Sequence, residues 1–207
     1  MNGSSFRRLA AFLAVFVGLG GIAYAILFAF IVAGTSPQVF RAWLILGILG
    51  GLAATGVFVA LYQHLRETDA AMALWALLLG VMAAIGQVVN AAVALGHELN
   101  PAVSGSAMTP DPLGVLRFGL NGLALFLFGS VLIRDRGFPK ALGYLAALGG
   151  LLLVVIYLLR LTAVIDPTQH VTLIPPFLYG FLVHPILYVW LGGVLARPGI
   201  EVAGNAH

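Results

Sequence analysis

The chain has 207 residues, of which 61% are hydrophobic and only 8% are charged, and it contains no cysteine. This composition lies far outside the range of soluble domains, and the lack of cysteine excludes disulfides, thiolate catalysis and cysteine-ligated metal or haem. The formal net charge of +3 comes from scattered Lys and Arg side chains, a pattern that does not indicate nucleic-acid binding. We therefore predict an integral membrane protein in which residues 1–207 form one domain.

Six apolar runs follow one another along the chain. Each holds roughly 20 residues or more, which gives a helix of about 30 Å, the thickness of the hydrocarbon core of a bilayer. The predicted fold is an all-α bundle of six transmembrane helices. Their predicted bounds are residues 9–33, 42–62, 71–95, 114–133, 141–165 and 176–196. The first run contains Ala23-Tyr24-Ala25, which is similar to a signal-peptidase site, but the run continues well beyond it and is predicted to remain as a helix.

Positive charges gather before the first run, in the second and fourth connections and after the sixth run. They are Arg7, Arg8, Arg66, Arg134, Arg136, Lys140 and Arg197. Arg41 is the exception, and the remaining connections carry Glu98, Asp111 and Asp166. By the positive-inside rule, both termini are predicted to be cytoplasmic, in a bacterial inner membrane.

Small residues are expected to set the helix packing. Gly47 and Gly51 form a Gly-x-x-x-Gly pair, and Gly18, Gly20 and Gly21 thin one side of the first helix. Such residues let helix backbones approach closely in a membrane. Packing within one subunit is favoured over a dimerisation face.

Six residues with polar side chains share one layer of the predicted bundle, roughly 4 to 14 Å below the outer boundary at 1.5 Å per residue. They are Gln87, Asn90, Arg117, Asn121, Arg160 and His184. Tyr188 lies one helical turn beyond His184 and on the same face of its helix. Because lipid offers no hydrogen bonds, we predict that they form a polar pocket for a small anionic or amphipathic ligand.

Other roles for these side chains stay open. Arg117 lies close enough to the interface to reach headgroups or to pair with Asp111, and Arg160 has Asp166 six residues on. Amides such as Gln87, Asn90 and Asn121 more often form hydrogen bonds between helices than contact a ligand, and a lone histidine such as His184 is more often a core residue. Pro185 follows His184 and predicts a kink, beside a group of aromatic residues. These are Phe177, Tyr179, Phe181 and Tyr188.

No cofactor or metal is predicted. Bis-histidine haem needs two imidazoles at matched depth, and only His97 and His170 qualify, both at helix ends or in loops. Zinc bound by His97, Glu98 and His170 lacks helical spacing and a fourth ligand. The sequence has no His-Glu-x-x-His, no Gly-x-Ser-x-Gly, no paired acids and no lysine within a run, so no enzyme is predicted.

Two long segments carry a family resemblance. They are LYQHLRETDAAMALWALLLGVMAAIGQVVNAAVAL from residue 61 and FGLNGLALFLFGSVLIRDRGFPKALGYLAALGGLLLVVIYLLRL from residue 118. The Leu-Tyr-x-x-Leu-Arg turn, the late Asn of the third helix and the Gly-rich fourth helix ending in Arg resemble the bacterial family named domain of unknown function 4386. This resemblance implies a six-helix inner-membrane protein and supplies no activity, catalytic residue or cofactor.

Two functional classes follow. The favoured one is a structural or accessory subunit of a membrane assembly, whose partners are the bilayer and another membrane protein or a second copy. The alternative is a binding or transport protein in which Arg160 and Arg117 hold a ligand beside Asn90, Asn121 and His184. The first is preferred because the connections are minimal and no carboxylate lies within a run to couple transport to protons.

Overall fold

The computed structural model describes residues 3–32, 34, 36–100, 116–161 and 170–197, and for residues 3, 4, 32, 160, 161 and 170–173 it describes the backbone alone. The described part of the chain contains no strand. Its elements are α1 (Gly3–Val32), α2 (Pro37–Leu99), α3 (Leu116–Arg134), α4 (Lys140–Leu161), α5 (His170–Leu178), the π-helical turn η2 (Tyr179–Val183) and α6 (His184–Leu195).

Five described helices are long and apolar enough to cross a membrane. They are Ser5–Ile31, Pro37–Leu99, Leu116–Arg134, Lys140–Leu159 and Ile174–Leu195, the last of which runs continuously through α5, η2 and α6. Large apolar side chains cover the outside of the molecule, for example Phe12, Trp75 and Leu78, which are more than half exposed. A soluble protein rarely exposes so much apolar surface. The predicted all-helical fold is therefore confirmed, with five apolar helices that could cross a membrane.

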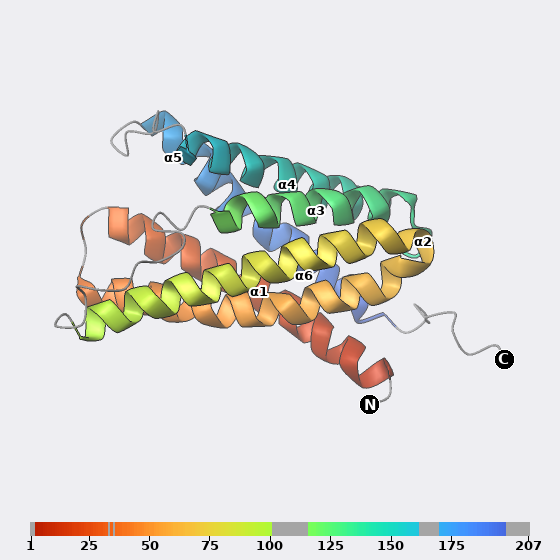
Figure 1. Cartoon of the computed structure of the whole chain (residues 1–207), viewed down its shortest axis with the longest axis horizontal. Helices are drawn as coiled ribbons and strands as arrows, with labels where there is room; N and C mark the ends of the chain where they lie inside the picture. Colours follow the sequence, from red (N-terminus) through yellow and green to blue (C-terminus); the bar gives the residue numbers. More distant parts are fainter. Residues whose placement is uncertain (1–2, 33, 35, 101–115, 162–169, 198–207) are drawn as a thin grey trace.

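Helix α2 replaces two predicted helices. Its 63 residues would extend roughly 95 Å if straight, about three times the thickness of the hydrocarbon core. Asp69 has non-helical backbone angles (φ −159°, ψ 93°), and α2 folds back there into two arms, as Figure 1 shows. The Asp69 carboxylate accepts the Met72 N–H at 3.0 Å, which caps the second arm. The predicted turn between residues 62 and 71 thus shrinks to one non-helical residue.

Polar contacts hold the two arms of α2 at the bend and at the opposite end. At the bend, Arg134 of α3 donates to Asp69 at 3.1 Å, and the Thr68 hydroxyl donates to Asp135 at 2.5 Å. The Met72 N–H and then the Arg134 guanidinium hold the pKa of Asp69, which lies outside the apolar arms, below its usual range. At the other end, Arg41 pairs with Glu98 at 3.3 Å and joins the two arms.

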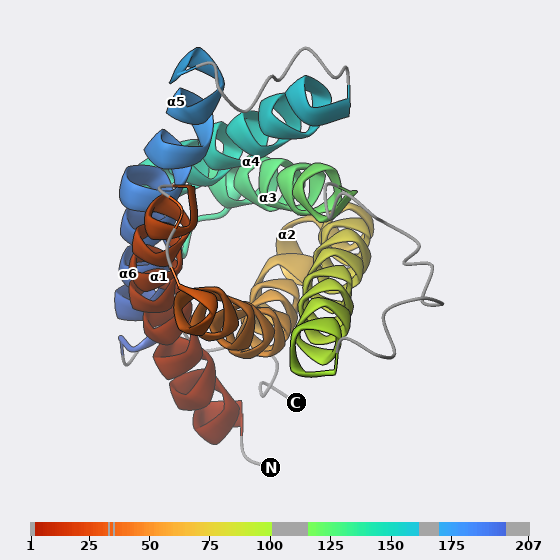
Figure 2. The same ribbon diagram turned by 90° about the vertical axis from the view of Figure 1, so that its left-hand side faces the viewer.

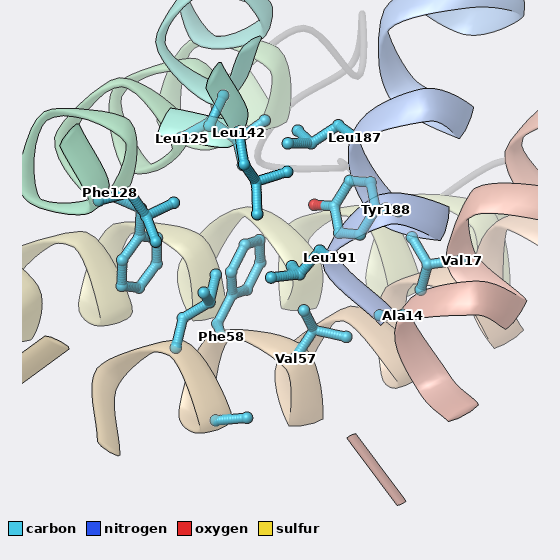
Figure 3. Packing of buried hydrophobic residues seen from close by; sticks show 14 of the residues in the cluster. Ala14, Val17, Val57, Phe58, Leu125, Phe128, Leu142, Leu187, Tyr188 and Leu191 are labelled. Carbon is cyan, nitrogen blue, oxygen red and sulfur yellow. The ribbon is translucent and has the colours of Figure 1, made fainter. Parts of the chain in front are cut away.

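The helices form a ring. Helix α1 packs against α6 and α2, α2 packs against α3, α3 packs against α4, and α4 meets α5, η2 and α6 to close the circle. Figure 2 shows this arrangement from the end opposite the α2 bend. The half of the ring nearer the bend is filled by apolar side chains, with the Phe58 and Phe128 rings stacked 5.9 Å apart at its centre (Figure 3).

Glycines bring the helices together. A Cβ atom added to Gly150 of α4 would lie 2.5 Å from the Gly122 carbonyl oxygen of α3, which is closer than Cβ atoms approach other atoms in proteins. The Gly47–Gly51 pair faces the second arm of α2, where a Cβ on Gly47 would lie 2.5 Å from Gln87 Nε2. This pair therefore serves packing within one chain.

A side chain at Gly150 is predicted to separate α3 from α4 and to destabilise the protein. Gly150→Ala should lower the free energy of unfolding by about 1–3 kcal/mol, because the backbones must separate. Thermal unfolding in detergent measures the change. Gly86→Ala is the matched control, since a Cβ there meets nothing within 4 Å. Equal melting temperatures for the two variants would contradict the close contact.

Candidate functional site

A cavity of about 260 Å³ lies inside the ring, in the half away from the α2 bend. It extends from Phe28, Trp43 and Phe177 to Phe58, where the packed apolar core begins. Its volume is near the lower end of the range for small-molecule sites. The polar side chains in its wall are Tyr24, Trp43, Gln87, Arg117, Asn121, Tyr179, His184 and Tyr188.

Five buried polar atoms in this wall have no hydrogen-bond partner within the described part of the chain. They are Trp43 Nε1, Arg117 Nε, Asn121 Oδ1, Tyr179 Oη and His184 Nδ1. A buried group without a partner costs about 1–3 kcal/mol, so native proteins contain few of them. All five atoms belong to residues that line this one cavity, which makes it the candidate site for a polar guest molecule.

Arg117 connects three helices at the cavity wall. Its Nη1 donates to Gln87 Oε1 on α2, and its Nη2 donates to the Tyr24 hydroxyl on α1 at 3.5 Å. Its guanidinium carbon also lies 4.8 Å from the centre of the Phe118 ring. The ion pairs among the described residues involve Arg41 and Arg134 and leave Arg117 without a carboxylate. Asp111, the predicted alternative partner, lies outside the described residues. Arg117 therefore brings a positive charge to the wall.

An aromatic group surrounds His184. The His184 ring lies 5.5 Å from the Tyr179 ring and 4.7 Å from the Tyr188 ring. Its other side rests on α1 at Gly21, where an added Cβ would lie 2.3 Å from His184 Nδ1. Only glycine therefore leaves room for the imidazole in this position.

The π-helical turn η2 places Tyr179 beside His184. Residues five apart lie about 140° apart around a regular α-helix. In η2 the His184 N–H donates to the Tyr179 carbonyl oxygen, five residues back, which brings both side chains to one face. Pro185 follows at once and has no N–H for a regular helical bond. The expected distortion is thus present as a π-helical turn.

Five of the seven predicted site residues line the cavity: Gln87, Arg117, Asn121, His184 and Tyr188. Asn90 is partly buried and does not line it. Arg160 belongs to α4 by its backbone, but its side chain, like the whole of Asp166, lies outside the described residues. Phe177 lines the cavity, whereas Phe181 stacks on Phe177 and is 40% exposed.

Sequence reasoning missed Tyr24 and Trp43 as site residues. Their rings stack with centres 4.8 Å apart and form the wall beside Arg117. Both look like ordinary apolar residues of a membrane helix, because aromatic rings also suit lipid contact. The available signal was the adjacent glycines, Gly20 and Gly21 before Tyr24 and Gly47 after Trp43, which make room for large side chains.

The described residues contain no group of three His, Cys, Asp or Glu side chains that could hold a metal ion. Glu98, one of the considered zinc ligands, pairs with Arg41, and the His170 side chain lies outside the described residues. No protein-family model, curated protein or solved structure matches this chain. The resemblance to domain of unknown function 4386 stays a prediction.

Two substitutions compare the loss of a hydrogen-bonded polar group with the loss of one that has no hydrogen bond. Gln87→Leu removes the acceptor of Arg117 and should lower the free energy of unfolding by about 1–3 kcal/mol. Tyr179→Phe removes a hydroxyl without a partner and should leave the stability of ligand-free protein unchanged or raise it. Chemical unfolding in detergent measures both, with Tyr144→Phe at an exposed position as the control. A large loss for Tyr179→Phe would show that its hydroxyl has a partner in the protein.

Proposed function

We propose that this chain is a membrane protein that binds a small molecule in the cavity between its helices. The observation that carries the proposal is the coincidence of the cavity with five buried polar atoms that lack partners among the described residues. Side chains that only held helices together would bond to one another, as Arg117 and Gln87 do. Movement of the ligand through the protein is the natural extension of this function.

The function favoured from the sequence is an accessory subunit whose polar side chains serve packing alone. The positions of the apolar and the polar side chains distinguish this function from ligand binding. Between the bend and Phe58 the fully buried side chains of the described residues are apolar, so the helices pack there mainly through apolar contacts. The polar side chains gather where that packing gives way to a cavity. This distribution favours a binding site over helix packing.

The proposed topology has six crossings, because each arm of α2 is long enough to span the bilayer. Support comes from charge: the end with the bend carries Arg66, Arg134, Arg136, Lys140 and Arg197. By the positive-inside rule this end faces the cytoplasm of a bacterial cell, with both termini on that side. The cavity then lies in the outer half of the membrane.

The binding proposal is tested by native mass spectrometry of protein extracted gently from its own membrane. A small molecule should stay bound in a one-to-one ratio. Arg117→Gln should lower its occupancy at least tenfold, since a hydrogen bond to a charged group contributes about 1.5–3 kcal/mol. Arg41→Gln is the matched control, because Arg41 pairs with Glu98 and does not line the cavity. A bound protein partner and no small molecule would favour the accessory subunit.

The topology is tested by single cysteines, which need no background removal because the chain has none. In spheroplasts, a membrane-impermeant maleimide should label Gln38→Cys and Asn100→Cys and should leave Glu67→Cys unlabelled. All three positions are exposed in the structure. Labelling of all three after lysis is the control. Labelling of Glu67→Cys in intact spheroplasts would contradict the proposed double crossing of α2.

A further inference from the structure

From the chemistry of the cavity wall we infer the class of the ligand: a small aromatic acid whose carboxylate faces the outer end of the cavity and whose hydrogen-bond donor, such as a phenol, faces the inner end. This inference rests on the proposed function and adds the identity and the orientation of the ligand. It follows from the order in which donors, rings and acceptors line the cavity.

The end of the cavity near Trp43 offers hydrogen-bond donors. The Trp43 indole N–H and the Arg117 Nε–H are buried without partners among the described residues, and neither group can accept a hydrogen bond. They belong to one group, because Arg117 reaches the Tyr24 hydroxyl at 3.5 Å and the Tyr24 ring stacks on Trp43. Two donors, one of them charged, match a carboxylate group of a ligand.

The deeper part of the cavity offers acceptors. Asn121 Oδ1 accepts only and is buried without a partner in the described part of the chain. His184 Nδ1 lies against Gly21 of α1 and does not belong to this set. The Tyr179 hydroxyl, on the ring next to His184, either accepts or donates. A hydroxyl or amine hydrogen of a ligand satisfies such a group, whereas a second carboxylate does not.

The helices fix the order and the spacing of the two groups. Tyr24 contacts the donor group, and Gly21 contacts His184, three residues nearer the bend on α1. On α3, Asn121 lies four residues nearer the bend than Arg117. These separations correspond to about 4.5 to 6 Å along a helix axis. One aromatic ring with substituents at opposite ends spans such a distance.

The remaining wall suits an aromatic ring. Phe16, Phe28, Phe58 and Phe118 line the cavity between and around the polar groups. Aromatic side chains favour a flat apolar guest through ring contacts. A cationic amine is disfavoured, because Arg117 has no carboxylate partner among the described residues and repels a second positive charge.

Four probes test the inference on the full-length protein in detergent by isothermal titration calorimetry. They are 4-hydroxyphenylacetate, phenylacetate without the hydroxyl, 4-hydroxyphenylethanol without the charge, and tyramine with the opposite charge. We expect 4-hydroxyphenylacetate to bind roughly tenfold or more tightly than each of the others. Equal or weaker binding than any of them overturns the inference.

Two conservative variants assign the ends of the ligand. Trp43→Phe keeps the ring and removes one donor, so it should weaken 4-hydroxyphenylacetate and phenylacetate by the same factor. Asn121→Leu should weaken 4-hydroxyphenylacetate several-fold and leave phenylacetate unchanged. The reverse pattern overturns the orientation. Should none of the probes bind while native mass spectrometry finds another small molecule sensitive to Arg117→Gln, the inference fails and the proposed function stands.

Discussion

The lack of hydrogen-bonding partners in a bilayer governs this structure. Polar side chains within membrane helices must bond to one another or face an enclosed space, because lipid satisfies none of them. The Arg117–Gln87 bond is the first solution, and the group of Asn121, Tyr179 and His184 around the cavity is the second. The charged pairs Arg41–Glu98 and Arg134–Asp69 lie at the ends of the helices, where water is available.

The two halves of the ring differ in how their interiors are packed. Toward the bend of α2, stacked Phe58 and Phe128 and the surrounding apolar side chains form a packed core, and the Asp69 network joins α2 to the α3–α4 connection. Away from the bend, the helices separate enough to leave a cavity. A packed half that holds the helices together and a hollow half that carries the polar groups form an arrangement suited to binding.

Position along each helix followed from counting residues, and it was the basis for grouping the polar side chains by depth. Gln87, Arg117, Asn121 and His184 do line one cavity. Counting residues could not show which side of each helix faces the cavity. Asn90 lies three residues after Gln87, and residues at this spacing are neighbours on a helix surface. Gln87 nevertheless packs against Gly47 and Gly51 and lines the cavity, and Asn90 does not.

The sequence alone determined the apolar helices and the similar level of the polar side chains along them, because hydropathy and helical rise are local properties. Only the tertiary structure decided that Tyr24 and Trp43 join the site, since their stacking depends on α1 and α2 lying side by side. It also decided the position of Tyr179, which a regular helix would direct away from His184 and the π-helical turn brings back. Contacts between distant segments set these features, and no local pattern records them.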